Sequence, residues 1–273
     1  MKNLFDLTGK CAVITGGAGV LGKQHARALI QMRCRVILWD IDENKLKEAV
    51  DGLNREFNDS VSEYDVIDIT VEQEILRGVS NISNGGRNID ILINNAAINP
   101  KLEDDSVSSR FENYSCITWN KEIAVGLTGA MLCSKIIGTK MITQQNKGVI
   151  LNISSDLSVI APDQRIYKSS ALLNQNSFVK PASYSVIKTG LIGLTRYLAT
   201  YWAEDGLRVN ALSPGGVFQN QDPNFVSRLE SLIPLGHMAN EDEYIGAVQF
   251  LCSDASAYLT GQNIVMDGGR SVW

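Results

Sequence analysis

The stretch ITGGAGVLGKQHA, residues 14–26, follows the apolar run CAVI and opens a segment with helical spacing of alanine and leucine. Its glycines read as G-x-G-x-x-G from position 17, and as T-G-x-x-G-x-x-G from position 15. A strand that runs into glycines and then a helix directs unpaired backbone N–H groups at a ligand, and glycine lets the backbone approach a pyrophosphate closely. The stretch therefore predicts a dinucleotide site in a βαβ unit.

Short β-branched runs alternate with longer helical patterns along the rest of the chain. This alternation predicts βαβ units and a doubly wound parallel sheet, an α/β fold with helices on both faces. No shift in composition marks a second domain, so we expect residues 1–273 to form one domain. Strands are expected at 11–15, 35–40, 63–68, 90–95, 149–154, 208–213 and 263–267, and helices near 20–32, 43–57, 71–84, 118–145, 183–204 and 240–252.

The composition excludes several classes of protein. A net charge of −5 argues against general nucleic-acid binding, which needs a basic face. The five cysteines are widely spaced and form no C-x-x-C pair, and the two histidines lie far apart, so we expect neither a disulfide framework nor a metal site. The N-terminal segment lacks the apolar core of a signal peptide, and no apolar run approaches the ~20 residues of a membrane helix. We expect a cytoplasmic protein without a membrane partner.

Asp40 ends the second expected strand, in RVILWDID, 18 residues after Gly22. A carboxylate at this place in a dinucleotide fold accepts hydrogen bonds from the adenosine ribose and repels a 2′-phosphate. No Arg or Lys lies in the glycine loop or just after Asp40, so NAD is favoured over NADP. The alternative is a solvated carboxylate at a strand end.

Tyr184 and Lys188 lie four residues apart in a helical pattern and so share one helix face. A tyrosine phenol is a poor base at neutral pH, but a nearby ammonium favours the phenolate. Such a pair can exchange a proton with a hydroxyl or carbonyl while a nicotinamide exchanges the hydride. The Y-x-x-x-K spacing is common, and an exposed helix pair is the alternative.

Together these motifs resemble the short-chain dehydrogenase/reductase family. The glycine loop is similar to that of a longer branch of the family, which includes sugar-nucleotide epimerases and dehydratases, whereas the body and C-terminus are similar to the single-domain branch. The resemblance implies a Rossmann sheet of about seven strands in the order 3-2-1-4-5-6-7, and a homodimer or homotetramer built on the two long helices. It rests on TGGAGVLG (15–22), Asp40, DIT (68–70), NNAA (94–97), NISS (152–155), YSVIK (184–188), RVNALSPGG (208–216) and TGQNIVMDGG (260–269).

The resemblance also implies the roles of individual residues. Tyr184 would be the general acid/base, Lys188 would bind the nicotinamide ribose and lower the tyrosine pKa, and Ser155 would hydrogen-bond the reacting oxygen. For Ser155, a strand-end cap is the alternative. The implied cofactor contacts, besides Tyr184 and Lys188, are Gly16, Gly19, Val20, Leu21, Gly22, Asp40, Ile41, Asp68, Ile69, Asn94, Asn95, Ala96, Ala97, Pro214, Gly215 and Val217.

The sequence departs from the family's pattern at three points. Gly126 stands where the family has an asparagine that supports a proton-relay water, and NNAA replaces the usual NNAG. Ser155 and Tyr184 are 29 positions apart, clearly more than the family's usual spacing. The excess forms an insertion at about 156–183, between two residues of the expected active site.

The insertion is basic and rich in amides within an otherwise acidic protein. Together with an expected substrate lid at about 216–238, it would suit an anionic, polyhydroxylated substrate such as a sugar phosphate or nucleotide sugar. A solvated or subunit-contacting loop is the alternative. The expected substrate contacts are Arg165, Lys168 and Lys180 in the insertion and His237 in the lid.

Several segments resemble, more narrowly, bacterial oxidoreductases of flagellin-modification and surface-glycan gene clusters linked to nonulosonic acids. Among these segments are SDLSVIAPDQRIY, LIGLTRYLATYWA and GQNIVMDGGRSVW. The leading hypothesis is an NAD(H)-dependent oxidoreductase that interconverts a secondary alcohol and a ketone on an anionic sugar. The alternatives are an epimerase or dehydratase that retains its NAD, suggested by the glycine loop, and an NAD(H)-binding protein without turnover.

Overall fold

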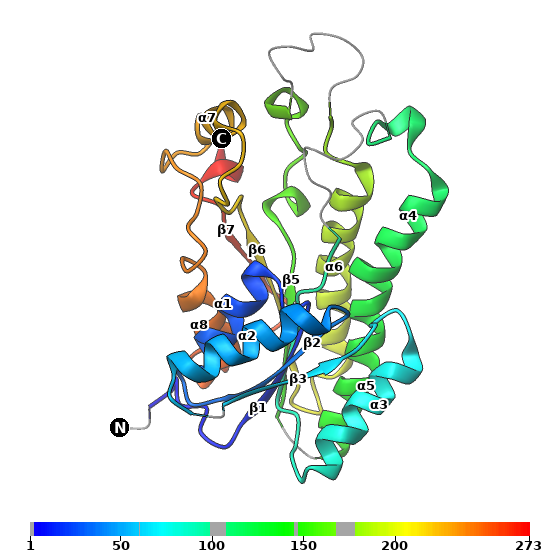
Figure 1. The fold of residues 1–273 in the computed structure, drawn as a ribbon, viewed down its shortest axis with the longest axis vertical. Coiled ribbons are helices and arrows are strands. Elements are labelled where there is room, and N and C mark those ends of the chain that lie inside the picture. The colour runs from blue at the N-terminus through cyan, green and yellow to red at the C-terminus, as the bar shows by residue number, and fades with distance from the viewer. Residues whose placement is uncertain (1–2, 60, 99–107, 145–146, 168–177) are drawn as a thin grey trace.

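Seven parallel strands form the centre of the molecule, in the order β3-β2-β1-β4-β5-β6-β7 (Figure 1). This confirms the expected strand number and order. The computed structural model describes residues 3–59, 61–98, 108–144, 147–167 and 178–273. The strands are β1 (Cys11–Thr15), β2 (Arg35–Asp40), β3 (Ser62–Val66), β4 (Ile91–Asn94), β5 (Val149–Ile153), β6 (Arg208–Pro214) and β7 (Asn263–Met266).

Helices cover both faces of the sheet (Figure 1). One buried cluster joins the sheet to α1, α2 and α8, through side chains such as Leu29, Leu46 and Val248. A second cluster joins the other face to α3, α5 and α6. The helices are α1 (Val20–Ile30), α2 (Glu43–Glu56), α3 (Glu72–Asn84), α4 (Cys116–Ile123), α5 (Gly129–Thr143), α6 (Ala182–Tyr201), α7 (Pro223–Glu230) and α8 (Ile245–Cys252).

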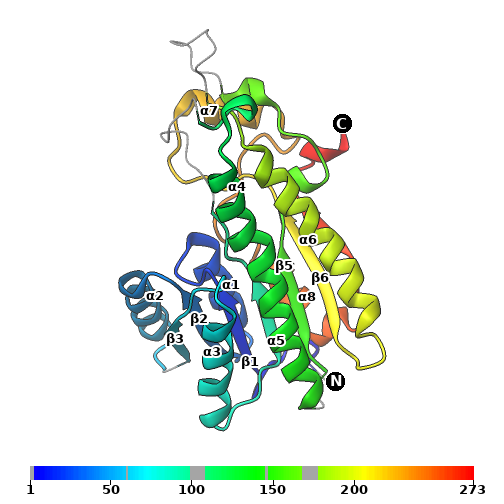
Figure 2. The same cartoon turned by 90° about the vertical axis from the view of Figure 1, so that its right-hand side faces the viewer.

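The expected helix at 118–145 is interrupted. A π-helical turn, Ala124–Thr128, separates α4 from α5, although the three segments follow one continuous course alongside α6 (Figure 2). The sequence pattern did not predict α7 inside the expected lid, yet Asp222 caps this helix and Pro223 occupies its first turn, which are the usual signals of a helix start. The last helix, α8, begins at Ile245, five residues later than expected.

The run Cys116–Thr143 is 28 residues long, and its most apolar 18-residue window has a mean hydropathy of 1.2, so by length and composition it could cross a membrane. This differs from the expectation that no apolar run would reach that length. Half of its most apolar window is buried inside the molecule, where the run contacts α3, α6 and the sheet. Packing in the core therefore accounts for its apolar composition.

The described parts of the insertion pack against the lid. Ile166 lies in a buried cluster with Leu229, Ile233 and Met238 of the 216–238 segment. The ring centre of Tyr167 lies 5.6 Å from that of Phe178, and 5.4 Å from that of Phe225 on α7. The two segments therefore form one apolar unit beyond the carboxyl ends of the strands.

Candidate active site

The glycine loop lies where the strand order reverses, between β1 and β4. The Asn95 side-chain amide donates to the carbonyls of Thr15 and Gly16, at 3.0 Å each. The Thr15 hydroxyl in turn accepts hydrogen bonds from the backbone N–H groups of Asn95 and Ala96, at 3.0 and 3.1 Å. These bonds fix the glycine loop to the segment after β4, at the crevice where parallel α/β sheets bind their ligands.

Close backbone contacts explain the glycines. Gly16 has φ +61°, and a Cβ added there would lie 2.8 Å from the Ala96 Cα. A Cβ on Gly17 would lie 2.7 Å from the Leu38 Cβ, and one on Gly22 would meet the Gly16 carbonyl. Gly19 precedes α1, which has neither a side-chain cap nor an acidic residue in its first turn. The backbone N–H groups in the first turn of α1, which begins with Val20 and Leu21, therefore remain available to an anion. Together with the glycine loop they form a concave site, called here the glycine cradle, that fits a pyrophosphate.

Asp40 ends β2 directly beside the glycine loop. One carboxylate oxygen accepts a hydrogen bond from the Ala18 backbone at 3.3 Å, and the other accepts from the Ile41 backbone at 2.8 Å. The Ile41 side chain is 71% exposed. The carboxylate is thus held at the end of β2, beside the glycine loop.

Other expected cofactor residues lie with their side chains in the protein. The buried Asn94 amide donates to the Ser134 hydroxyl at 3.0 Å and to the side-chain oxygen Oδ1 of Asn152 at 2.8 Å. The Ile69 side chain is in the core, against Gly129. The side chains at positions 94 and 69 therefore point into the protein, which the sequence pattern did not show.

The remaining expected cofactor residues lie at the carboxyl ends of strands. The Asp68 carboxylate accepts from the Thr70 backbone at 2.8 Å, and Ala97 is exposed after β4. Pro214 ends β6, and the Gly215 N–H donates to the Met266 carbonyl at 2.8 Å. Val217 forms an isolated parallel bridge with Ala239, which ties the start of the lid to its end.

The structure brings Ser155, Tyr184 and Lys188 together. Ser155 follows β5, and the other two lie in the first turns of α6. The Ser155 hydroxyl lies near enough to the Tyr184 phenol to lower its pKa. The Lys188 ammonium donates to the Ile153 carbonyl at 2.8 Å and lies 5.7 Å from the centre of the Tyr184 ring. A hydroxyl, a phenol and an ammonium therefore meet at the carboxyl edge of the sheet.

Burial governs the ionisation of these groups. It raises the pKa of Tyr184, the neighbouring Ser155 hydroxyl opposes that rise, and the charge of Asp156 adds to it. Burial and, to a lesser extent, the charge of the nearby Lys180 lower the pKa of Lys188 to about 8. Both shifts favour the neutral forms of the two side chains. The Tyr184 phenol therefore ionises near neutral pH only if nearby positive charges stabilise the phenolate by more than burial destabilises it.

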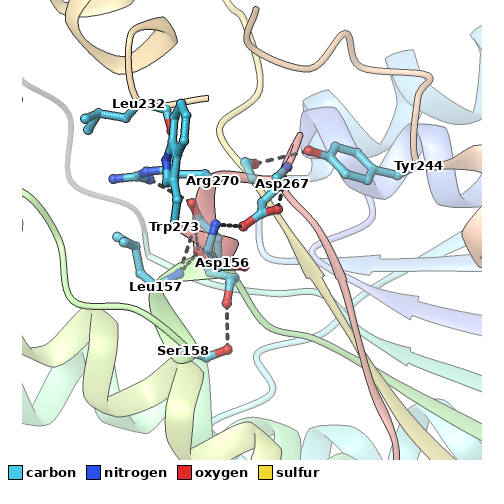
Figure 3. A network of polar contacts seen from close by, with 12 residues as sticks. Asp156, Leu157, Ser158, Leu232, Tyr244, Asp267, Arg270 and Trp273 are labelled. Atoms are coloured by element: carbon cyan, nitrogen blue, oxygen red, sulfur yellow. Dashed lines mark hydrogen bonds and ion pairs between the residues drawn. The ribbon is translucent and has the colours of Figure 1, made fainter. Parts of the chain in front are cut away.

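An ion pair that the sequence pattern did not predict supports Ser155. The Arg270 guanidinium lies 2.7 Å from one carboxylate oxygen of Asp156, and both side chains are less than a tenth exposed. The other oxygen of Asp156 accepts from the Ser155 hydroxyl at 2.9 Å and from the Leu157 backbone at 2.8 Å. Figure 3 shows this network, which connects the C-terminal segment to the loop after β5.

The turn before Arg270 is built by its own residues. Gly268 and Gly269 have φ +66° and +89°, a conformation that favours glycine. The Asp267 carboxylate accepts from the backbones of Gly269 and Ser271, at 3.0 and 2.7 Å. The Trp273 indole donates to the Leu232 carbonyl of the lid at 3.1 Å (Figure 3). In the sequence, the only local sign of the Asp156–Arg270 ion pair is the arginine that directly follows Asp267-Gly268-Gly269.

A second buried carboxylate lies on α4. Glu122, 4% exposed, accepts hydrogen bonds from the Tyr114 hydroxyl at 2.5 Å and from the Ser183 hydroxyl. Ser183 directly precedes Tyr184, so this cluster supports the start of α6. At Gly126, one turn after Glu122, an added Cβ would lie 2.7 Å from the Ile187 side chain. Close packing of the two helices thus occupies the place of the relay asparagine.

The four expected substrate contacts fall in different places. The Lys180 ammonium lies 3.8 Å from the centre of the Tyr184 ring. Arg165 is 81% exposed and its guanidinium pairs with Asp163 at 2.7 Å, so its charge is already matched by its neighbour. Lys168 lies outside the described residues. His237 is exposed and lines a cavity of about 510 Å³ between the lid and the C-terminal segment, next to Gly215.

Among the described residues, no group of three or more His, Cys, Asp or Glu side chains could hold a metal ion. The site combines a glycine loop with unpaired N–H groups at a helix start, a carboxylate beside that loop and a phenol–ammonium pair. These are the parts of a nicotinamide-dependent dehydrogenase.

Sequence comparison identifies the family. Residues 10–171 match the family described as short chain dehydrogenase, and residues 168–271 match the one described as Enoyl-(Acyl carrier protein) reductase. The chain belongs to the short-chain dehydrogenase family and is an oxidoreductase that binds a nicotinamide cofactor and interconverts an alcohol and a carbonyl compound.

Similar proteins of known name agree with this assignment. An NAD-dependent glycerol dehydrogenase of Listeria innocua is 31% identical over 275 residues, which cover 98% of this chain and 96% of the relative. A short chain dehydrogenase of Leptospira borgpetersenii with bound NAD⁺ has a TM-score of 0.85 at 32% identity, covering 99% of this chain and 96% of its own. A gluconate 5-dehydrogenase of Burkholderia cenocepacia, in complex with NADP and tartrate, has a TM-score of 0.83 at 26% identity, covering 99% and 98%.

Proposed function

We propose that the protein is an NAD(H)-preferring dehydrogenase that oxidises a secondary alcohol, or reduces the matching ketone, on an anionic sugar-type substrate. The observation that carries the proposal is the meeting of Ser155, Tyr184 and Lys188 beside a glycine cradle at one edge of the sheet. The proposal that this sugar belongs to surface-glycan synthesis rests only on the narrower sequence resemblance.

In this proposal each side chain has one task. The nicotinamide, when bound, accepts or returns the hydride. Tyr184 takes the alcohol proton as phenolate and returns it as phenol, while Ser155 hydrogen-bonds the same oxygen and orients it. The Lys188 ammonium, close to the Tyr184 ring, favours the phenolate and would hold the nicotinamide ribose. The proposed cofactor contacts are those named from the sequence, with Asn94 and Ile69 acting through their backbones.

The preference for NAD is proposed from Asp40. Replacement Asp40→Asn removes the charge that repels a 2′-phosphate, so we expect the ratio of NADPH to NADH affinity to rise by about tenfold, or about 1.4 kcal/mol. Calorimetric titration of cofactor-stripped protein with NADH and NADPH measures this ratio. Asp42→Asn is the matched control, because asparagine can still cap α2 and the residue lies two positions away. Parent protein that binds NADPH as tightly as NADH would remove the basis of the proposal.

The anionic substrate is proposed from Lys180, whose ammonium lies beside the reacting tyrosine. The similarity to a gluconate 5-dehydrogenase that holds tartrate supports a sugar acid or a related anion. We expect the NADH complex to bind members of a panel of keto-sugar acids and sugar phosphates more tightly than neutral ketoses of the same length. A panel in which only neutral ketoses or polyols react would limit the substrate class to uncharged sugars.

We also propose a homo-oligomer. Tyr197 and Tyr201 stack on the outer face of α6 with ring centres 5.6 Å apart, and they are 62% and 64% exposed. Exposed aromatic side chains on a long helix are typical of a subunit contact. Light scattering of the parent and of a Tyr197→Glu variant tests this, since the variant is expected to dissociate.

A further inference from the structure

Two lysines, not one, lie beside Tyr184. The Lys188 ammonium is 5.7 Å from the ring centre, whereas the Lys180 ammonium is 3.8 Å from it. An ammonium within about 6 Å of an aromatic face is attracted by the ring, and the attraction grows when the ring bears the negative charge of a phenolate. The nearer cation comes from the insertion.

The insertion holds Lys180 through its backbone. The Gln164 side chain accepts from the Lys180 N–H at 2.9 Å and donates to the Lys180 carbonyl at 3.2 Å. Gln164 begins a short turn whose Tyr167 packs against Phe178 and against Phe225 of α7. The backbone of Lys180 is therefore held in place by the Gln164 clamp and the apolar unit, so that its side chain starts from a fixed point beside the ring.

The charged side chains around the Tyr184 ring carry one more positive than negative charge. Three cationic side chains, Lys180, Lys188 and Arg270, accompany the carboxylates Asp156 and Glu122. Asp156 is paired with Arg270, and Glu122 accepts from two hydroxyls. Ionisation of Tyr184 would neutralise the surplus positive charge. Further titratable groups surround this cluster: Tyr167 interacts with Tyr184, Tyr114 donates to Glu122, Asp163 interacts with Arg270, and Tyr244 interacts with Asp156.

We infer that Lys180 is a second cation of the reaction centre, placed by the insertion to stabilise the Tyr184 phenolate. The inference rests on the proposed function for its consequence, which is that Tyr184 accepts the alcohol proton near neutral pH. In this inference Lys180 acts on the Tyr184 phenolate in addition to the anionic group of the substrate.

The pH range of the effect follows from the lysine itself. Burial lowers the pKa of Lys180, the charges of Asp156 and Glu122 oppose part of that shift, and the resulting pKa is about 8. Lys180 is therefore charged below about pH 8, where its support of the phenolate is present, and the support is lost as the pH rises through that value. Once Tyr184 ionises, its own charge keeps the ammonium protonated to higher pH, so the two groups titrate as a pair.

Ultraviolet difference titration of tyrosinate tests the inference without substrate or turnover. The Tyr184→Phe counterpart of each variant is subtracted, which isolates the Tyr184 signal. In Lys180→Met we expect the pKa of Tyr184 to rise by about one unit or more, and the acidic limb of kcat/KM for alcohol oxidation to move equally. Lys180→Arg should retain most of the parent's behaviour, and Lys147→Met, on an exposed loop, should change nothing.

A second variant covers the case in which Lys180→Met does not fold. Gln164→Leu keeps the ammonium but removes its clamp, so a smaller shift in the same direction is expected. An unchanged Tyr184 titration in both variants overturns the inference, as does a Lys180→Met protein whose only defect is a raised KM for anionic substrates. A shifted titration in a protein that oxidises no alcohol would instead refute the proposed function and leave the inference standing.

Discussion

Tyr184→Phe is expected to bind NADH as the parent does and to lose about 10²- to 10⁴-fold in kcat/KM, the usual contribution of a general acid/base. The phenyl ring fills the same space over Lys188, but it has no proton to exchange with the substrate oxygen. Steady-state assays at saturating cofactor measure the loss, and calorimetry measures the NADH affinity.

Tyr197→Phe is the matched control for this substitution. Tyr197 lies on the same helix, is 62% exposed and stacks on Tyr201. We expect its loss of hydroxyl to leave kcat/KM unchanged. A Tyr184→Phe protein that turns over as fast as the parent would show that the proton passes through another group.

Arg270→Met is expected to lower the free energy of unfolding by about 3–5 kcal/mol, because it leaves the Asp156 carboxylate buried without its ion pair. Urea unfolding of the parent and the variant measures the change. The double variant Asp156→Asn/Arg270→Met removes the buried charge as well, so it should recover part of the loss. It should not recover activity fully, because an asparagine in place of Asp156 would hold Ser155 differently.

Arg165→Met provides the contrast for the buried pair. It breaks an ion pair of similar length, 2.7 Å, whose arginine is 81% exposed. Water solvates these two charged groups in the folded and in the unfolded protein. Loss of the pair should therefore lower the free energy of unfolding by less than about 1 kcal/mol. If Arg270→Met cost no more than Arg165→Met, the C-terminal segment would not be an anchor of the loop after β5.

The sheet could be predicted from the sequence because its strands are short, β-branched and separated by glycine-rich or polar turns. RVILWD and CAVIT match β2 and β1 residue for residue. The π-helical turn at Ala124–Thr128 could not be predicted, because its side chains continue the helical pattern while the backbone gains one residue in the turn. The helix α7 was missed although Asp222-Pro223 signals its start.

The site was predictable where local spacing places residues together. Tyr184 and Lys188 share a helix face whatever surrounds them, and Asp40 ends a strand beside the glycine loop. Arg270 and Asp156 are 114 positions apart, so no local pattern joins them. The same holds for Glu122 and Ser183, which meet only because α4 lies along α6.

The most direct test of the account follows the hydride itself. A substrate alcohol found in the panel is prepared with deuterium on its carbinol carbon and incubated with the protein and NAD⁺. The account predicts that deuterium appears in NADH released to solution, in step with the ketone formed, and that Tyr184→Phe forms little of either. Deuterium that stays on the sugar while the carbinol centre inverts, with no NADH released, would contradict it and indicate an epimerase that retains its NAD.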